Sequence, residues 1–288
     1  MRIVHFSDIH IGRWPSGTSF LFDKRVLGLT NYFLRRRLGF QSALLAPAVS
    51  TIRALNPDWM VCTGDITTVG SPEEFQAVRD ALAPLMADGL GQRLILVPGN
   101  HDVYVRNRAC RAALEDCFAG CNASRWTLAE LPQRVQASHL SLWVVDECCC
   151  TNWLLSSGRV SAVTAGQLED WLEAPRVAGE KRILIGHFPL RDPAGVPLGW
   201  RRRLVGADRL AAALRDGRLD VSLCGHEHRP FVRREPSGSM EVCAGALLVW
   251  GKINVLDYCE ASGRLTQTWV DVPWGAFPAP ALPLPAPS

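Results

Sequence analysis

Five short polar motifs, each just after a short apolar segment, limit the possible folds of this chain more than any other feature of its sequence. The apolar segments are rich in Val, Ile and Leu, which is typical of buried strands. The motifs contain Asp, Asn and His, whose side chains bind metal ions. They are Asp8-Ile9-His10, Gly64-Asp65, Gly99-Asn100-His101-Asp102, Gly186-His187 and Gly225-His226-Glu227-His228.

The positions of these motifs predict that they meet in space. In α/β proteins the carboxyl ends of the strands border the crevice where ligands bind. Residues two apart on an extended segment point to the same side, so Asp8 pairs with His10, and His226 pairs with His228. A glycine directly before a ligand, as at Asp65, lets the backbone turn sharply beside an ion or phosphate. We therefore expect one metal centre built from distant segments.

The remaining pattern indicates an α/β protein with a mainly β final part. Apolar and helix-like segments alternate up to Gly225, and strand-like segments separated by turns follow. Strands are predicted at 3–7, 59–63, 93–97, 140–145, 182–185, 221–224, 231–234, 240–243, 247–256 and 265–270, and helices at 42–55, 72–88, 106–118, 164–173 and 207–215. We expect two sheets packed between helices in one domain, residues 1–275, followed by a Pro/Ala-rich tail, residues 276–288.

Composition narrows the class of protein further. A net charge of +3 gives no argument for nucleic acid as a partner. Asp8 comes too early for a secretory leader, and no apolar run approaches the roughly 18 residues of a membrane span. Ten cysteines without zinc-finger spacing fit free thiols in a reducing compartment. We expect a cytoplasmic protein, with any membrane contact peripheral and at the inner face of the membrane.

The ligand types indicate the metal and the chemistry. Imidazole and carboxylate ligands without thiolate suit Mn²⁺, with Fe and Zn²⁺ as alternatives. Five of the seven histidines lie in the motifs, and only His5 and His139 lie outside them. A carboxylate that bridges two divalent ions roughly 3.5–4 Å apart would give a two-metal hydrolase, with a metal-bridged hydroxide as the nucleophile.

The ordered pattern D-x-H, G-D, G-N-H-D, G-H and G-H-x-H resembles that of the calcineurin-like metallophosphoesterase superfamily, from about Met1 to His228. The resemblance implies an α/β fold, a four-layer αββα sandwich with two central mixed sheets flanked by helices. It implies one metal bound by Asp8, His10, Asp65 and His228, and a second bound by Asp65 (bridging), Asn100, His187 and His226. It also implies that His101 protonates the leaving oxygen and that Asp102 orients the imidazole of His101.

Two features bear on the substrate. Residues 20–40 form a basic amphipathic insertion, with Phe22, Val26, Leu29 and Phe33 on one helical face and positive charge from Lys24, Arg25 and Arg35–Arg37. Through Phe20–Arg37 it either contacts an anionic lipid surface or an acyl chain, or it packs as a cap on its own domain. Arg201, Arg202 and Arg203 either bind an extra phosphate or belong to a solvated loop.

The insertion resembles that of a bacterial branch of the superfamily that includes a UDP-2,3-diacylglucosamine pyrophosphatase of lipid A biosynthesis, which implies a lipid-linked diphosphate as substrate. A cyclic-nucleotide phosphodiesterase is the alternative, because residues 70–74, which follow Gly64-Asp65, resemble the segment after the same motif in such enzymes. Those enzymes commonly carry His-His-Pro where this chain has His187-Phe188-Pro189, and this difference counts against the alternative. A repair nuclease is disfavoured because no DNA-binding domain follows His228. A non-catalytic module with a scaffolding metal site is the other alternative, although every motif position is filled. The sequence leaves the oligomeric state open.

Overall fold

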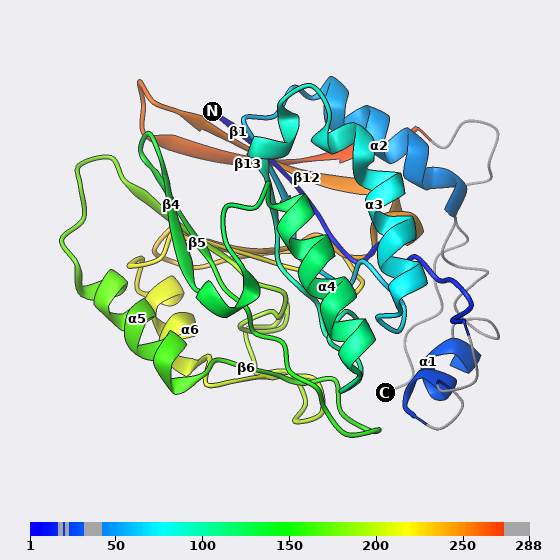
Figure 1. Cartoon of the computed structure of the whole chain (residues 1–288). Coiled ribbons are helices and arrows are strands. Elements are labelled where there is room, and N and C mark those ends of the chain that lie inside the picture. Colours follow the sequence, from blue (N-terminus) through cyan, green and yellow to red (C-terminus); the bar gives the residue numbers. More distant parts are fainter. Residues whose placement is uncertain (17–19, 21–22, 32–41, 274–288) are drawn as a thin grey trace.

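The computed structural model describes residues 1–16, 20, 23–31 and 42–273, and two β-sheets form the centre of the molecule (Figure 1). The strand order is β13–β12–β1–β2–β3 in the first sheet and β10–β11–β9–β7–β5–β4 in the second, and β6 pairs with β8 apart from them. The strands are β1 (Arg2–Phe6), β2 (Trp59–Cys62), β3 (Leu94–Leu96), β4 (Gln133–Ala137), β5 (Leu140–Val144), β6 (Gly158–Arg159), β7 (Lys181–Ile185), β8 (Leu204–Val205), β9 (Val221–Cys224), β10 (Phe231–Arg234), β11 (Met240–Cys243), β12 (Lys252–Cys259) and β13 (Arg264–Asp271).

Parallel strands form one side of the first sheet, out to its edge at β3, and the middle of the second sheet. β1, β2 and β3 run parallel, as do β5, β7, β9 and β11. β12 pairs with β1 antiparallel, and β4 and β10 are antiparallel strands at the two edges of the second sheet. Both sheets are therefore mixed, and the parallel strands of each sheet end on the same side, where the polar motifs begin.

Helices cover the outer faces of the sheets. The described helices are α1 (Arg25–Asn31), α2 (Leu45–Ala54), α3 (Pro72–Met86), α4 (Arg108–Cys121), α5 (Ala162–Glu173), α6 (Asp208–Arg215) and α7 (Leu247–Trp250), with 3₁₀ turns η3 (Ser42–Leu44), η4 (Leu90–Arg93) and η5 (Leu128–Glu130). Figure 1 shows α5 and α6 on one side of the molecule, away from α2, α3 and α4. The N-terminus of α3 has the expected signals, since the Ser71 hydroxyl accepts the N–H of Glu74, and Pro72 begins the helix.

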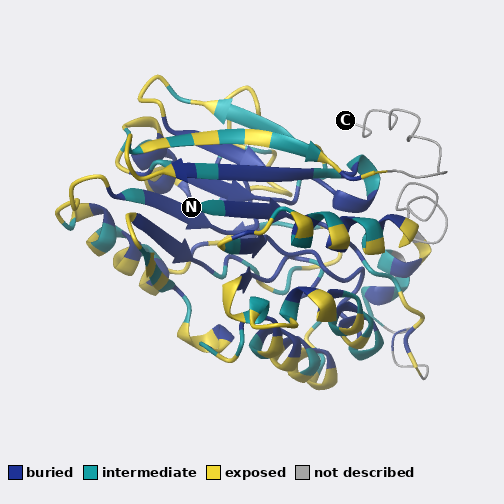
Figure 2. Ribbon diagram, turned by 90° about the horizontal axis from the view of Figure 1, so that it is seen from above, coloured by how far each residue is buried: buried dark blue, intermediate teal, exposed yellow. Residues whose placement is uncertain are grey.

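Strand β5 makes the layering visible. Leu142 and Val144 belong to the large core that contains both sheets and the inner faces of α2, α3 and α4. Trp143 and Val145 belong to a second core together with residues of α5 and α6. Alternate side chains of a strand point to opposite faces, so the second sheet lies between two cores. Figure 2 shows the central strands buried and the helices exposed along their outer sides. The expected four-layer αββα sandwich is confirmed.

One strand prediction was wrong. Residues 247–256 were expected to be extended, but Leu247–Trp250 form the short helix α7, and β12 begins only at Lys252. A short apolar run fits a helix or a strand equally well. Gly251, with φ of 57°, ends the helix in the left-handed conformation that glycine adopts without strain. The short strands β4, β6 and β8 were not predicted from the sequence.

The insertion of residues 20–40 is described in part. α1 packs on the domain, with Leu29 in a small apolar cluster that also contains Phe20 and Val69. Phe22, Phe33 and Arg35–Arg37 lie outside the described residues, as does the tail of residues 276–288. Among the described helices, none has the length and apolarity required to cross a bilayer. All ten cysteines are free thiols, and six of them are buried.

Candidate metal centre

Each predicted ligand segment begins after the end of a parallel strand. Asp8 follows β1, Asp65 follows β2, Asn100 follows β3, His187 follows β7 and His226 follows β9. The two sheets are joined here by direct bonds between the motifs. The carboxylate of Asp8 accepts the backbone N–H of His226 at 3.2 Å, and Nδ1 of His187 lies 2.6 Å from the carbonyl oxygen of Thr63. Distant segments therefore meet in one cluster.

The backbone of this cluster is strained. Five of the seven proposed ligands have positive φ angles, between 44° and 68°: Asp8, His10, Asp65, His226 and His228. Residues with a Cβ rarely adopt this conformation, which costs about 1–3 kcal/mol each and persists mainly at functional sites. The strained loops are tied to one another, since the N–H of Asp8 donates to the carbonyl of Gly64 and the N–H of His10 donates to that of Asp65.

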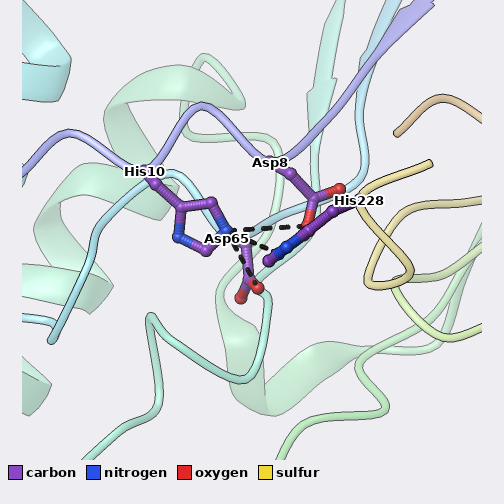
Figure 3. Close-up of side chains that lie close together, drawn as sticks. All are labelled: Asp8, His10, Asp65 and His228. Atoms are coloured by element: carbon purple, nitrogen blue, oxygen red, sulfur yellow. Dashed lines mark hydrogen bonds and ion pairs between the residues drawn. The ribbon is translucent and has the colours of Figure 1, made fainter. Parts of the chain in front are cut away.

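Asp8, His10, Asp65 and His228 form the first ligand group (Figure 3), with one candidate ligand atom of each within 4.8 Å of the others. Nε2 of His10 lies 2.9 Å from Nε2 of His228 and 3.6 Å from Oδ2 of Asp65. Nε2 of His228 lies 3.4 Å from Oδ1 of Asp8. Two imidazole nitrogens and two carboxylates thus point at one small volume.

Asp65, His187 and His226 form the second group. Nε2 of His187 lies 3.5 Å from Oδ1 of Asp65. The side-chain oxygen of Asn100 completes this group, at 3.1 Å from Nε2 of His187 and 2.8 Å from Nδ1 of His226. Asp65 is the residue common to both groups, which is the position of a bridging carboxylate.

The donor set fits divalent cations. Oδ2 of Asp65 is buried and has no hydrogen-bond partner among the described residues. Carboxylate, amide and imidazole donors without thiolate suit Mn²⁺, Fe or Zn²⁺, and a buried acceptor of this kind is costly unless a cation or donor meets it. The two groups together support two metal ions, with Asp65 between them.

The pKa shifts of the buried side chains also favour a site for cations. Burial and the nearby carboxylate of Asp65 raise the pKa of Asp8 to about 7. Burial opposes the charged form of His187, but the negative charges of Asp65 and Asp8 raise the pKa of His187 to about 10. Burial also acts against charge on Asp65, yet the positive charge of His187 keeps the pKa of Asp65 well below its ordinary value. Buried carboxylates this close need positive charge between them, which divalent ions supply.

His101 lies beside the first group, and its surroundings differ from the expectation for Asp102. The His101 backbone N–H donates to Oδ1 of Asp65 at 2.8 Å, and Nδ1 of its ring lies 2.6 Å from the carbonyl oxygen of Thr68. That carbonyl, and not the carboxylate of Asp102, therefore meets Nδ1. Both oxygens of Asp102 instead accept hydrogen bonds within the loops, from Thr67 at 2.7 and 2.9 Å and from Gly99 at 2.8 Å. Asp102 thus supports the loops that carry the site.

The three predicted substrate-binding arginines, Arg201, Arg202 and Arg203, differ in their contacts. All three are exposed. Arg202 forms an ion pair of 3.0 Å with Glu227, which lies between His226 and His228 in the sequence. Arg201 lies over the ring of Trp200, 5.1 Å from its centroid. The structure therefore brings Arg202 next to the segment that carries His226 and His228.

Two buried or half-buried contacts of the site were missed from the sequence. Glu147 accepts the backbone N–H of His187, and the ring of Tyr104 stacks on that of His101. Glu147 follows strand β5 in the pair Asp146-Glu147, so the rule that found the other motifs, metal-ligand residue types after an apolar strand, also applied there. Nothing in the sequence around Tyr104 pointed to its stacking partner.

Comparison with known proteins agrees with this geometry. The family model described as calcineurin-like phosphoesterase matches residues 1–230. Glycerophosphodiester phosphodiesterase GpdQ from Enterobacter lignolyticus (strain SCF1) is 30% identical over 198 residues, which are 64% of this chain and 61% of that protein. The matched part therefore spans about three fifths of the length of that relative.

Solved structures show the same fold at low identity. A dimetal phosphatase from Danio rerio aligns with 95% of this chain and 99% of its own, with a TM-score of 0.58 and 14% identity. Purple acid phosphatase PPD1 from yellow lupin aligns with 94% of this chain and 53% of its own, with a TM-score of 0.54 and 13% identity. The family match, the fold and the two ligand groups lead to one conclusion: the chain belongs to the calcineurin-like phosphoesterase family.

Proposed function

We propose that the chain hydrolyses phosphodiester or pyrophosphate bonds at a centre of two metal ions that share Asp65, with His101 as the acid for the leaving group. The observation that carries this proposal is the position of Asp65, which is common to both ligand groups and accepts the N–H of His101 at 2.8 Å. A shared carboxylate supports two neighbouring cations, and the bond to His101 keeps the proposed acid beside them.

The proposed division of ligands follows the two groups. Asp8, His10 and His228 would hold one ion, and Asn100, His187 and His226 would hold the other, with Asp65 between them. Two such ions, when bound, supply a water of lowered pKa as nucleophile and positive charge against the phosphoryl oxygens. We expect Mn²⁺ to support the highest activity, with Fe and Zn²⁺ as alternatives.

The side chains of the chain itself supply the proton transfer. Nδ1 of His101 donates to the carbonyl of Thr68, so Nε2 is the nitrogen that can pass a proton to the leaving oxygen. In the reaction the water oxygen bonds to phosphorus, the bond from phosphorus to the leaving oxygen breaks, and that oxygen receives the proton from His101. The guanidinium of Arg202 is exposed and paired with Glu227, and its remaining N–H groups would bind a second phosphate of the substrate.

Apolar groups on the rim support a substrate that carries an acyl chain. Trp153, Leu154 and Trp200 are more than half exposed. The loops that carry them run side by side, since the N–H of Ser156 donates to the carbonyl of Arg201 at 2.9 Å. Exposed aromatic and aliphatic side chains beside arginines suit an amphiphilic anionic substrate. The substrate proposed is UDP-2,3-diacylglucosamine or a similar lipid-linked diphosphate of lipid A biosynthesis, used by a cytoplasmic protein at the inner face of the membrane.

A glycerophosphodiester is the second candidate, because the relative GpdQ is named as a glycerophosphodiester phosphodiesterase. The test is to measure kcat/KM in parallel with Mn²⁺ for UDP-2,3-diacylglucosamine, a glycerophosphodiester, cyclic AMP and bis-p-nitrophenyl phosphate. The diacylated substrate should be preferred. A wide preference for cyclic AMP or the glycerophosphodiester would overturn the lipid assignment but leave the two-metal chemistry. No hydrolysis of any substrate with Mn²⁺, Fe²⁺ or Zn²⁺ would favour the scaffold alternative.

His101→Ala tests the acid role. This variant should retain two metal ions, measured by elemental analysis, while kcat falls by about 10²–10⁴-fold on a substrate with a basic leaving group. An unchanged kcat would remove His101 from the mechanism.

A further inference from the structure

The ring of Tyr104 covers one face of the His101 imidazole. Their centroids are 5.2 Å apart and the planes differ by 17°, which is a stacked arrangement. Tyr104 lies in the loop between β3 and α4, three residues after His101. Aromatic pairs in this geometry attract each other beyond the effect of burial alone. Tyr104 therefore restricts the plane in which the His101 ring can lie.

Lys24, which belongs to the insertion and lies directly before α1, contacts the ring of Tyr104. Its ammonium nitrogen lies 4.5 Å from the Tyr104 ring centroid, within the range of a cation–π contact. The same nitrogen donates hydrogen bonds of 3.0 Å to the hydroxyl of Thr151 and the carbonyl of Leu155. Lys24 thus connects three segments, and these bonds keep its charge above the tyrosine instead of free in solvent.

Helix α1 also packs closely against Tyr104 and Val69 at Gly28. A Cβ at position 28 would lie 2.6 Å from Cγ1 of Val69 and 2.9 Å from the hydroxyl oxygen of Tyr104, closer than real Cβ contacts. Val69 directly follows Thr68, whose carbonyl meets Nδ1 of His101. Helix α1 therefore contacts Tyr104, which stacks on His101, and Val69, which follows the hydrogen-bond partner of His101. A side chain at position 28 would separate these surfaces.

We propose that Tyr104 is a positioning residue for His101 and that Lys24 and Gly28 of the insertion hold Tyr104 in place. This proposal rests on the proposed function, in which His101 is the acid. The hydrogen bond at Nδ1 and the ring of His10, edge-on at 4.8 Å between centroids, are two restraints on rotation of the His101 imidazole, and the Tyr104 stack is a third. An acid must lie within hydrogen-bond reach of the leaving oxygen. The stack restricts this rotation, so loss of the stack should slow only the reactions that need the proton.

Leaving groups of different basicity provide the test. A p-nitrophenolate ion leaves without protonation, whereas a phenolate ion, which is more basic, depends more on the acid. The variants Lys24→Met, Lys24→Arg, Tyr104→Leu, Tyr104→Phe and Gly28→Ala would be assayed in the full chain with Mn²⁺ on bis-p-nitrophenyl phosphate and on diphenyl phosphate. Lys252→Met is the matched control, because Lys252 pairs with Asp271 in the exposed part of β12 and β13. Thermal melting and metal content establish that each variant is folded and loaded.

Lys24→Met, Tyr104→Leu and Gly28→Ala should lower kcat for diphenyl phosphate about tenfold more than for the p-nitrophenyl ester, with KM and metal content unchanged. Tyr104→Phe, which keeps the ring, and Lys24→Arg, which keeps the charge, should restore most of the rate. In a His101→Ala background, Lys24→Met and Tyr104→Leu should have no further effect.

Equal losses on both esters, or an undiminished effect in the His101→Ala background, would overturn the positioning role. The failure of the proposed function gives a different result. If His101→Ala itself slows both esters equally, the acid role is wrong, and the positioning role is wrong with it. If His101→Ala separates the two esters and the Tyr104 and Lys24 variants do not, only the positioning role is wrong.

Discussion

Oε2 of Glu147 accepts a hydrogen bond of 2.9 Å from the backbone N–H of His187, a ligand of the second group. The same oxygen accepts the N–H of Phe188 at 2.8 Å. The carboxyl group lies directly under Gly186, where a Cβ would be 2.5 Å from it. Burial raises the pKa of Glu147 to about 7. This carboxyl group therefore sets the backbone path that carries the His187 imidazole, and it does so without contacting the ligand atom.

Glu147→Ala should damage both stability and metal binding. The N–H groups of His187 and Phe188 would lose their acceptor, so the free energy of unfolding should fall by about 3 kcal/mol, measured by urea denaturation. Affinity for the second metal should weaken about 10–100-fold, measured by metal titration. Glu147→Gln, which keeps an acceptor oxygen, should lose less of both. Equal metal affinity in the alanine variant and the wild type would show that His187 needs no such support.

Asp65→Asn should remove more metal than a change at a ligand of one group. Asp65 belongs to both ligand groups, whereas His228 belongs only to the first. Elemental analysis should find less metal bound to Asp65→Asn than to His228→Ala, which should keep the ion of the second group. The kcat of Asp65→Asn should fall by more than about a hundredfold, because even residues that only support ligands cost 10–100-fold. Full metal content in Asp65→Asn would contradict the bridging position.

Removing metal should lower the melting temperature. Asp8 and Asp65 are both buried, and the charge of Asp65 contributes to the raised pKa of Asp8. Cations that bind only the folded state should stabilise it by about 2.7 kcal/mol at a concentration a hundred times Kd. Melting curves with EDTA and with increasing Mn²⁺ measure this effect. Asp65→Asn should show a much smaller Mn²⁺-dependent rise, and an equal rise in both proteins would place the stabilising ion elsewhere.

Stability should decrease below neutral pH because of His5. Its ring is buried, with Nε2 3.0 Å from the Thr63 hydroxyl, and burial lowers its pKa to about 3. The unfolded chain, with an ordinary histidine pKa near 6.5, binds more protons between these values. The contribution of His5 is therefore present above pH 6.5 and is lost as the pH falls, by about 2 kcal/mol between pH 7 and pH 5.

His5→Gln, which carries no charge at any pH, should show a correspondingly smaller loss of unfolding free energy between pH 7 and pH 5. Denaturation of both proteins at saturating Mn²⁺ measures the difference, because effects on the metal ligands are common to the two. His139→Gln is the control, since His139 is exposed. The same pH dependence in His5→Gln and the wild type would mean that His5 contributes nothing to it.

Three residues differ in how far the sequence could predict their place in the site. Asp65 was named as a ligand from its place after an apolar strand, and the structure puts it in both ligand groups. Glu147 stands after β5 in the same way, but its function depends on a hydrogen bond to a backbone forty residues away. Asp102 was expected to orient His101, because the family resemblance implied it and a catalytic imidazole usually needs an orienting partner. Its carboxylate instead bonds to Thr67 and Gly99, which only the folding of the loops could reveal.

The sequence by itself determined the type of fold and the set of candidate metal-binding side chains. Strand periodicity and side-chain chemistry are properties of short segments, so they can be recognised before any segment is placed. Tertiary structure decided which ligands share a site, that Asp65 stands between the two groups, and that Lys24 reaches the ring of Tyr104. These relationships depend on how two sheets and an inserted helix pack together, and a displacement of a few ångströms, invisible in the sequence, would abolish every one of them.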